Sequence, residues 1–344
     1  MAISLFEKVE SRRGLFGVEK ISLIYGLLTT ALIFIMFNQL HDPMQMLIGR
    51  AVIMGATLIL MYLYRLAPCK ATAFIRIGLQ LGLLAYWYPD TFEFNRIFPN
   101  LDHIFATIEE GIFGFQPAIT FHQTYPQLWI SELFNMGYFF YYPMIAIVAI
   151  YFFIKNFEKF DKFSFVIVTS FFIYYLIFIF VPVAGPQFYF PAIGLDNVAE
   201  GIFPAIGDYF NNNTELLSGP SNGVGGFFYS LVETSQQVGE RPTAAFPSSH
   251  VGISTILMIM CWKENKKLFA SLFPFYFFLC GATVYIQAHY LIDVFVGFAS
   301  AFGVYTLSCK IHAKWFSIPV FKIYDSVVME YVNSTTTTTN SKRN

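Results

Sequence analysis

Long apolar runs constrain this chain more than any other feature of its sequence. Because a bilayer offers no water to backbone polar groups, an apolar segment of about 20 residues crosses it as an α-helix. Eight such runs are present, at about 21–40, 46–67, 71–88, 128–154, 163–184, 247–262, 268–287 and 289–310. Hydrophobic residues make up 56% of the 344 residues and charged residues only 12%, more apolar surface than a soluble chain could bury. The sequence therefore predicts an all-α polytopic membrane protein with about eight transmembrane helices.

The segments outside these runs differ from them in composition. Residues 1–20 are charged and are predicted to lie on the inner membrane surface, and residues 312–344 end in a low-complexity tail predicted to be partly disordered. Residues 89–127 are mixed and acidic, and within them Leu101–Phe115 spaces its apolar residues as a helix on the outer surface would. Residues 185–245 are rich in Gly, Pro and Asn, which indicates an ordered outer loop.

The distribution of positive charge predicts the orientation. Of the 21 Lys and Arg residues, 18 lie in the two termini and in the connections near 65–76, 155–162 and 263–267. The opposite set of connections contains only Arg96 and Arg241. Because Lys and Arg favour the cytoplasmic side, both termini are predicted to lie in the cytoplasm and the opposite connections outside. The net charge of −1 gives no electrostatic footprint for a nucleic acid partner.

The four cysteines indicate neither a disulfide framework nor a metal site. They are Cys69, Cys261, Cys280 and Cys309, none of which falls in the segments predicted to lie outside, and their spacing matches no zinc pattern. We interpret them as small packing residues. No metal and no cofactor is therefore expected.

Two histidines stand where apolar helices begin. His250 and His289 lie 39 residues apart. Before His250, Pro247 suits the first turn of a helix, and Ser248 and Ser249 are capping hydroxyls. Such a turn offers free backbone N–H groups and a positive dipole end, which predicts a binding place for a phosphate oxygen.

Asp293 follows His289 by four residues, so on a helix the two side chains share one face. A carboxylate there can hold one imidazole nitrogen and leave the other free to attack, as in a catalytic triad whose nucleophile is histidine. The alternative is a structural pair that locks two helices. Because histidine is uncommon in membrane helices without a purpose, the second helix start at His250 favours the catalytic interpretation.

The motifs around these residues resemble those of a known family. FPSSH, which ends at His250, resembles the second motif of the type 2 phosphatidic acid phosphatase (PAP2) superfamily. HYLID, from His289 to Asp293, resembles the end of its third motif. Sphingolipid-synthase-like members, including inositol phosphorylceramide synthase, have similar motifs, and GFQP at Gly114–Pro117 and SELFNMGYFFYYP at Ser131–Pro143 extend the resemblance upstream.

The resemblance implies a chemistry for the two motifs. His289 would attack phosphorus to give a phosphohistidine, with Asp293 orienting the imidazole, and His250 would donate a proton to the departing alcohol. Ser248, Ser249 and their backbone N–H groups would hold the non-bridging oxygens. Water or an acceptor hydroxyl would then resolve the phosphohistidine.

The resemblance also implies a division of the chain. A PAP2-type helical bundle, the catalytic core, is expected over 128–311, with accessory transmembrane helices and the outer interfacial helix in 21–127. Residues 1–20 and 312–344 are the cytoplasmic N-terminal segment and tail. The expected location is a bacterial inner membrane, with the active site at the outer face.

Two cations of the family pattern are missing. The first motif has a Lys seven residues before an Arg-Pro pair, where this chain has Thr234 relative to Arg241. The third motif has an Arg six residues before its His, where this chain has Thr283. Arg241 is the only basic residue of the 185–245 loop, and we interpret it as a phosphate ligand rather than a solvated anchor. Because a phosphodiester carries one negative charge and a monoester close to two, fewer cations favour a diester donor.

The sequence therefore predicts a lipid phosphotransferase that moves a phospho-alcohol headgroup between membrane lipids, similar to inositol phosphorylceramide synthase. The alternative is a lipid phosphate phosphatase acting on phosphatidic acid, an isoprenyl diphosphate or a sphingoid-base phosphate. A transporter or scaffold would spread its ionisable residues over several helices near the midplane, whereas here they cluster at one face.

Three further residues are weaker candidates for the pocket. Gln187 occupies a turn that could line the site, and Gln287 lies two residues before the second histidine. Glu132 could bind a headgroup or simply pair with His122 or Tyr138. The sequence does not indicate an oligomeric state.

Overall fold

The chain is almost entirely helical in its computed structural model, which describes residues 5–9, 14–213, 216 and 225–317. The tail beyond Ser317, predicted to be partly disordered, lies outside these residues. In chain order the helices are α1 (Gly17–Ile35), α2 (Pro43–Leu66), α3 (Lys70–Gly82), α4 (Leu84–Asn95), α5 (Asp102–Phe113), α6 (Pro117–Thr124), α7 (Leu128–Phe139), α8 (Tyr141–Lys155), α9 (Phe157–Phe180), α10 (Pro186–Ile193), α11 (Leu195–Ala199), η1 (Tyr209–Asn211), α12 (Phe227–Gly239), α13 (Ser249–Glu264), α14 (Lys266–Tyr285) and α15 (Leu291–Ser317).

The predicted membrane spans are all helical, but three are broken or short. Within the described residues, α1, α2, α9, α14 and α15 are long and apolar enough to cross a membrane, and α7 and α8 add a sixth span if the pair, bent by 44°, crosses as one. The run at 71–88 is divided at Leu83 into α3 and α4, and the run at 247–262 forms α13, which has 16 residues. The chain is therefore an all-α, multi-pass membrane protein, as predicted.

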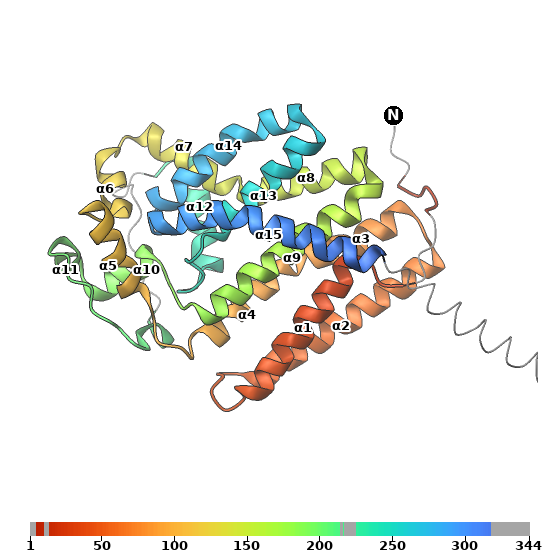
Figure 1. The fold of residues 1–344 in the computed structure, drawn as a ribbon, viewed down its shortest axis with the longest axis horizontal. Coiled ribbons are helices and arrows are strands. Elements are labelled where there is room, and N and C mark those ends of the chain that lie inside the picture. Colours follow the sequence, from red (N-terminus) through yellow and green to blue (C-terminus); the bar gives the residue numbers. More distant parts are fainter. Residues whose placement is uncertain (1–4, 10–13, 214–215, 217–224, 318–344) are drawn as a thin grey trace, which may run out of the picture.

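Helix α9 forms the centre of the bundle. Within its most apolar stretch 78% of the residues are buried, against 22–33% in the other four helices that are long enough to cross a membrane. It packs against α1 and α4 on one side and against α8, α13 and α15 on the other (Figure 1). Helix α13 lies between α14 and α15, so the first predicted histidine is carried by an inner helix.

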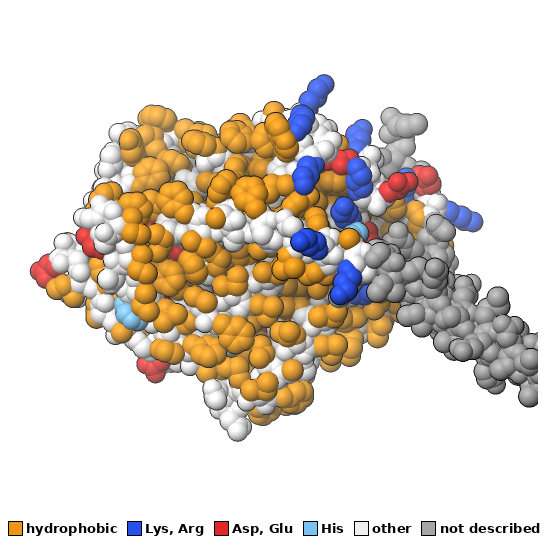
Figure 2. Space-filling model, in the orientation of Figure 1, with side chains coloured by type: hydrophobic (Ala, Val, Ile, Leu, Met, Phe, Trp, Pro, Cys, Tyr) orange, Lys and Arg blue, Asp and Glu red, His pale blue; other side chains and the backbone are white. Residues whose placement is uncertain are grey.

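The two ends of the bundle differ in charge. Lys and Arg side chains gather at one end, which we call the lysine end (Figure 2). The exposed basic residues of its connections are Arg65, Lys155, Lys159, Lys162, Lys263, Lys266, Lys267, Lys310 and Lys314. The opposite end, formed by α5, α6, α10 and α11, carries the starts of α13 and α15, and we call it the histidine end.

Two buried ion pairs hold the accessory helices together. Arg50 on α2 makes two hydrogen bonds, of 3.0 and 2.7 Å, to the carboxylate of Asp90 on α4. Arg76 on α3 binds Glu19 on α1 through its Nε and Nη2 atoms. Because a paired and doubly hydrogen-bonded Arg is tolerated where a lone one is not, these pairs explain how Arg50 stands within a spanning helix.

Candidate active site

His250 and His289 come together although 39 residues separate them. His250 is the second residue of α13, and His289 lies in the connection 286–290 between α14 and α15. Nε2 of His289 lies 3.4 Å from Nδ1 of His250, and the ring centroids are 5.6 Å apart. The fold therefore brings the two imidazoles that the motifs singled out into direct contact.

The hydrogen bonds of His289 determine which of its nitrogens is free. Nδ1 lies 2.7 Å from the carbonyl oxygen of Ala245, which can only accept, so Nδ1 carries the proton and Nε2 holds a lone pair. Burial lowers the pKa of His289 to about 4, although the Ala245 carbonyl and the Glu240 carboxylate act in the opposite direction. At neutral pH His289 is therefore an uncharged imidazole whose Nε2, facing His250, is suited to act as a nucleophile.

Asp293 lies beside His289 without hydrogen-bonding it. Its Oδ2 atom is 3.6 Å from Nδ1 of His289. That oxygen instead accepts from the backbone N–H of Tyr290 at 2.9 Å, a donor at the start of α15 that has no acceptor within the helix. The bond expected between Asp293 and His289 is thus replaced by one to the Ala245 carbonyl, while the Asp293 carboxyl group stays 3.6 Å from Nδ1.

Ser248 and Ser249 lie at the start of α13. Ser248 is the N-cap: its Oγ accepts from the N–H of Val251 at 3.4 Å, and its own N–H donates to the Asp293 carbonyl at 3.1 Å. The N–H groups of Ser249 and His250 belong to the first turn, where a helix offers no acceptor. These two donors and the helix dipole can therefore bind a phosphate oxygen beside His250.

Two glycines let the segments around the histidines pack closely. A Cβ on Gly297 of α15 would lie 2.5 Å from the Ser248 carbonyl oxygen. A Cβ on Gly185 would lie 2.5 Å from the Ala288 carbonyl oxygen, and Gly185 has a φ of +93°, which other residues rarely adopt. Both positions therefore require glycine.

The ring of His250 is held by two tyrosines. Tyr138 on α7 stacks on it with a centroid distance of 4.8 Å, and Tyr141 on α8 lies 4.5 Å away. Both tyrosine side chains are buried. The helix pair α7–α8 therefore forms the wall of the site behind His250.

Glu240 is a site residue that the sequence pattern did not indicate. One of its carboxylate oxygens accepts from the Tyr138 hydroxyl at 2.8 Å, and the other accepts from the side-chain amide of Gln187. Gln187 in turn accepts from Nε2 of Gln236 at 3.1 Å. Gln187, a weaker candidate from the sequence, thus belongs to a polar network next to the histidines.

Arg241 points along its own backbone in this structure. Its Nη1 atom donates to the carbonyl oxygen of Glu240 at 2.9 Å, and the side chain is half-buried. No hydrogen bond joins it to either histidine within the described residues. Its expected role as a phosphate ligand therefore needs the guanidinium to turn from this carbonyl or to bind phosphate with its remaining N–H groups.

The other two pocket candidates have structural roles. Gln287 has a φ of +66°, and its carbonyl oxygen accepts from the backbone N–H of Gln187 at 2.9 Å, which joins two turns of the site. Glu132 accepts from the N–H groups of Phe228 and Tyr229 at 2.9 and 3.0 Å, so it caps the start of α12. The structure does not bring Glu132 into the group of side chains around His250 and His289, which we call the histidine cluster.

Helix α5 holds the turn that carries His289, a role that its sequence did not indicate. Asp102, fully buried, accepts from the Tyr290 hydroxyl at 3.0 Å and from the N–H groups of Ala184 and Gly185 at 2.7 and 2.8 Å. Glu109, also fully buried, accepts from the N–H of Leu291 at 2.6 Å. Burial raises the pKa of Asp102 and raises that of Glu109 to about 8.

Among the residues that the structure describes, no group of three or more His, Cys, Asp or Glu side chains is placed to hold a metal ion.

The two positions where the family pattern has cations lie in different surroundings. Thr283 is fully buried; its hydroxyl donates to the Cys280 carbonyl at 2.9 Å, and its own carbonyl accepts from the N–H of His289 at 3.0 Å. Thr234 is exposed on α12, and its hydroxyl donates to the Ser230 carbonyl at 2.8 Å. Thr283 is therefore built into the turn that holds His289.

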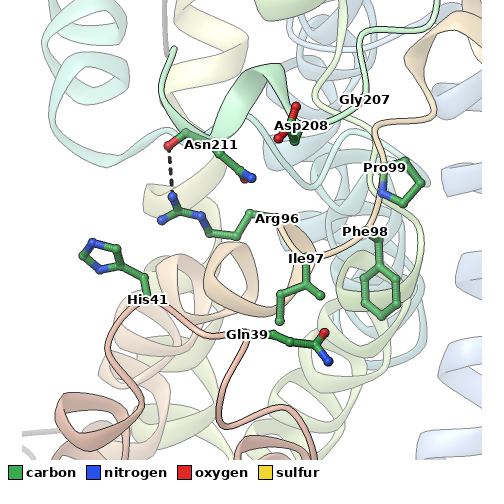
Figure 3. Close-up of a pocket in the computed structure, with 9 residues that line it drawn as sticks. All are labelled: Gln39, His41, Arg96, Ile97, Phe98, Pro99, Gly207, Asp208 and Asn211. Carbon is green, nitrogen blue, oxygen red and sulfur yellow. Dashed lines mark hydrogen bonds between the residues drawn. The ribbon is translucent and has the colours of Figure 1, made fainter.

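A cavity of about 690 Å³ lies elsewhere, and none of the predicted site residues lines it. Arg96 crosses it to donate to the carbonyl of Asn211 at 2.9 Å, and His41 lies at its edge (Figure 3). Its lining is Gln39, His41, Arg96, Ile97, Phe98, Pro99, Gly207, Asp208 and Asn211.

Comparison with known proteins identifies one family. The family model described as the PAP2 superfamily matches residues 103–307, which extend from α5 through most of α15 and include every residue of the histidine cluster. No curated protein and no solved structure matches the chain.

Proposed function

The chain belongs to the PAP2 superfamily, whose members are phosphatases and phosphotransferases, and on that premise we propose that it transfers a phospho-alcohol headgroup from one membrane lipid to another. The observation that carries the proposal is the contact between Nε2 of His289 and Nδ1 of His250, because it pairs a nucleophile with a proton donor at one point. The transfer would resemble that of inositol phosphorylceramide synthase.

The proposed reaction has two balanced steps. In the first, Nε2 of His289 forms a bond to phosphorus as the P–O bond to the donor lipid breaks, and protonated His250 gives its proton to the departing oxygen. In the second, the hydroxyl of the acceptor lipid gives its proton to His250 and attacks phosphorus, and the P–N bond breaks. Because the two rings are now in contact, we expect them to separate when phosphate binds.

The neighbouring groups have matching roles in this proposal. The Ala245 carbonyl fixes the His289 tautomer, and Asp293 stabilises the positive charge that develops on the ring. The free N–H groups at the start of α13, together with Ser248 and Ser249, would hold the non-bridging oxygens. Arg241 would supply the one mobile cation.

The charge of the site favours transfer from a diester over hydrolysis of a monoester. Thr234 and Thr283 replace both cations of the phosphatase pattern, and Glu240 adds a carboxylate beside the histidines. A monoester with nearly two negative charges would therefore be poorly balanced here, whereas a diester with one would be balanced by Arg241.

The distribution of charge supports an orientation as well. Because exposed Lys and Arg gather at the lysine end (Figure 2), we propose that this end and both termini face the cytoplasm of a bacterial cell. The histidine end would then lie at the outer face of the inner membrane, where the site would meet lipids of the outer leaflet.

The direct test is turnover by the purified full chain in detergent. The wild-type protein, offered a phosphodiester lipid with ceramide or diacylglycerol, should transfer the headgroup, and His289→Ala should transfer nothing. If the wild-type protein instead releases inorganic phosphate rapidly from a lipid monoester and transfers no headgroup, the transferase assignment is wrong. The chain would then be a lipid phosphatase using the same residues.

A further inference from the structure

Glu240 places a carboxylate beside the histidines in addition to Asp293. The Glu240 carboxylate is held from two sides, by the Tyr138 hydroxyl at 2.8 Å and by the side-chain amide of Gln187. Both partners donate to it, one to each carboxylate oxygen. Because a carboxylate repels an anionic substrate, Glu240 must have a role other than binding phosphate.

Its partners tie Glu240 to both histidines. Tyr138, which binds the carboxylate, also stacks on the ring of His250 at 4.8 Å. Gln187, on the other side, donates its backbone N–H to the carbonyl oxygen of Gln287. Gln287 lies two residues before His289. The charge of Glu240 also acts on the pKa of His289, so the carboxylate lies within electrostatic range of the nucleophile.

We propose that Glu240 is a specificity-determining residue, which makes the site select a singly charged phosphodiester over a doubly charged phosphomonoester. The inference deepens the proposed function and rests on it, because it concerns phosphate bound at Nε2 of His289. A monoester differs from a diester by close to one unit of negative charge, and that extra charge is the part that Glu240 repels.

The adjacent Arg241 does not cancel this effect. Its guanidinium donates to the main-chain carbonyl of Glu240, whereas the carboxylate accepts from Tyr138 and Gln187, so Arg241 is not hydrogen-bonded to the charge of Glu240. A monoanion can use the guanidinium alone, whereas the second charge of a dianion meets the carboxylate. For unit charges several Å apart at an effective dielectric constant of about 20, the discrimination amounts to about tenfold to a hundredfold in kcat/KM.

The substitution that isolates the charge is Glu240→Gln. The new amide oxygen can still accept from the Tyr138 hydroxyl, and its NH2 group can donate to the side-chain oxygen of Gln187 if the amides of Gln187 and Gln236 turn over. The matched control is Glu233→Gln, which removes the same charge from an exposed position on α12. A carboxylate with a merely structural role would change turnover of both substrates equally.

The experiment compares two probes, short-chain phosphatidic acid as the monoester and short-chain phosphatidylinositol with diacylglycerol as the diester pair. Glu240→Gln should raise the ratio of monoester to diester kcat/KM at least tenfold, and Glu233→Gln should leave it within twofold of wild type. A ratio unchanged in Glu240→Gln overturns the inference while the proposed function stands.

A second measurement begins with the wild-type protein and needs no turnover. Dimethyl phosphate, a monoanion, should protect the histidines from diethyl pyrocarbonate at a concentration at least tenfold lower than methyl phosphate at pH 8, where the latter is a dianion. Equal protection, or better protection by methyl phosphate, overturns the inference. If the protein turns over neither lipid probe, the proposed function fails, and the protection ratio, measured in wild type and in Glu240→Gln, still decides the role of Glu240.

Discussion

Asp102→Asn tests whether α5 positions the nucleophile. The two oxygens of Asp102 accept four hydrogen bonds, from the N–H groups of Ala184 and Gly185, the Tyr290 hydroxyl and the Asn100 amide. These donors come from three separate segments, and Tyr290 is the neighbour of His289. Loss of this acceptor should therefore loosen the turn that fixes the ring.

The magnitude follows from the donors that Asn cannot serve. If its NH2 group takes the place of Oδ1, the Tyr290 hydroxyl can turn to accept from it, but the N–H of Gly185 is left without an acceptor. If it takes the place of Oδ2, the N–H of Ala184 and the Asn100 amide both lose theirs. The first arrangement is cheaper, and one buried unsatisfied N–H costs about 1–3 kcal/mol. A misplacement worth about 1.4 kcal/mol at the transition state lowers kcat/KM tenfold.

The assay pairs stability with turnover. We expect Asp102→Asn to lose about 2 kcal/mol of folding free energy in detergent, seen as a lower melting temperature, and at least tenfold in kcat/KM. The control is Asp42→Asn, because Asp42 caps the exposed start of α2 through Gln45 and Asn is an equally good cap. An Asp102→Asn protein with wild-type melting and turnover would refute the reasoning.

Three further predictions concern charge. Because burial raises the pKa of Glu109 from 4.5 to about 8, its contribution to stability is fully present below about pH 4.5 and is lost as the pH rises through about 8. The melting temperature of Glu109→Gln should therefore rise relative to that of wild type between these pH values. A difference that stays constant with pH would contradict this. Arg241→Ala should lower kcat/KM about a hundredfold or more, whereas Arg96→Ala, at the distant cavity, should not change it; equal losses would show a general charge effect. A reporter fused after Lys162 should lie in the cytoplasm and one near Asn212 outside, and the reverse would overturn the orientation.

The helices and the two histidines could be predicted because their signals are local. An apolar run followed by charged residues marks a membrane helix wherever the rest of the chain lies, and Ser248 marks the start of α13 by its own capping bond. What these runs cannot show is whether a span is straight. The breaks at Leu83 and Phe140 leave the hydrophobicity of their runs unchanged, so both were predicted as single spans.

Three acids of the site, Asp102, Glu109 and Glu240, could not be predicted because their partners are distant in the chain. Glu240 binds a tyrosine 102 residues away, and Glu109 binds a backbone N–H 182 residues away. One signal was available in the sequence: Asp102 and Glu109, seven residues apart, share a face of α5. The structure buries that face and exposes Ile104, Ile108 and Ile112 on the other. A surface helix that buries its acids and exposes its isoleucines indicates that the acids hold something inside.

The surroundings of Thr283 determine whether the charge of the site can be changed at that position. Its side chain is fully buried and bonded to the Cys280 carbonyl, and its carbonyl holds the N–H of His289. An Arg at this position would need to displace that packing, so Thr283→Arg would disturb the nucleophile as well as add a charge. The charge near His250 and His289 is therefore best altered at Glu240, where Gln has nearly the same shape as Glu. In the proposed mechanism, the cation at Arg241 and the carboxylate at Glu240 then adjust the charge that the substrate meets through two adjacent residues.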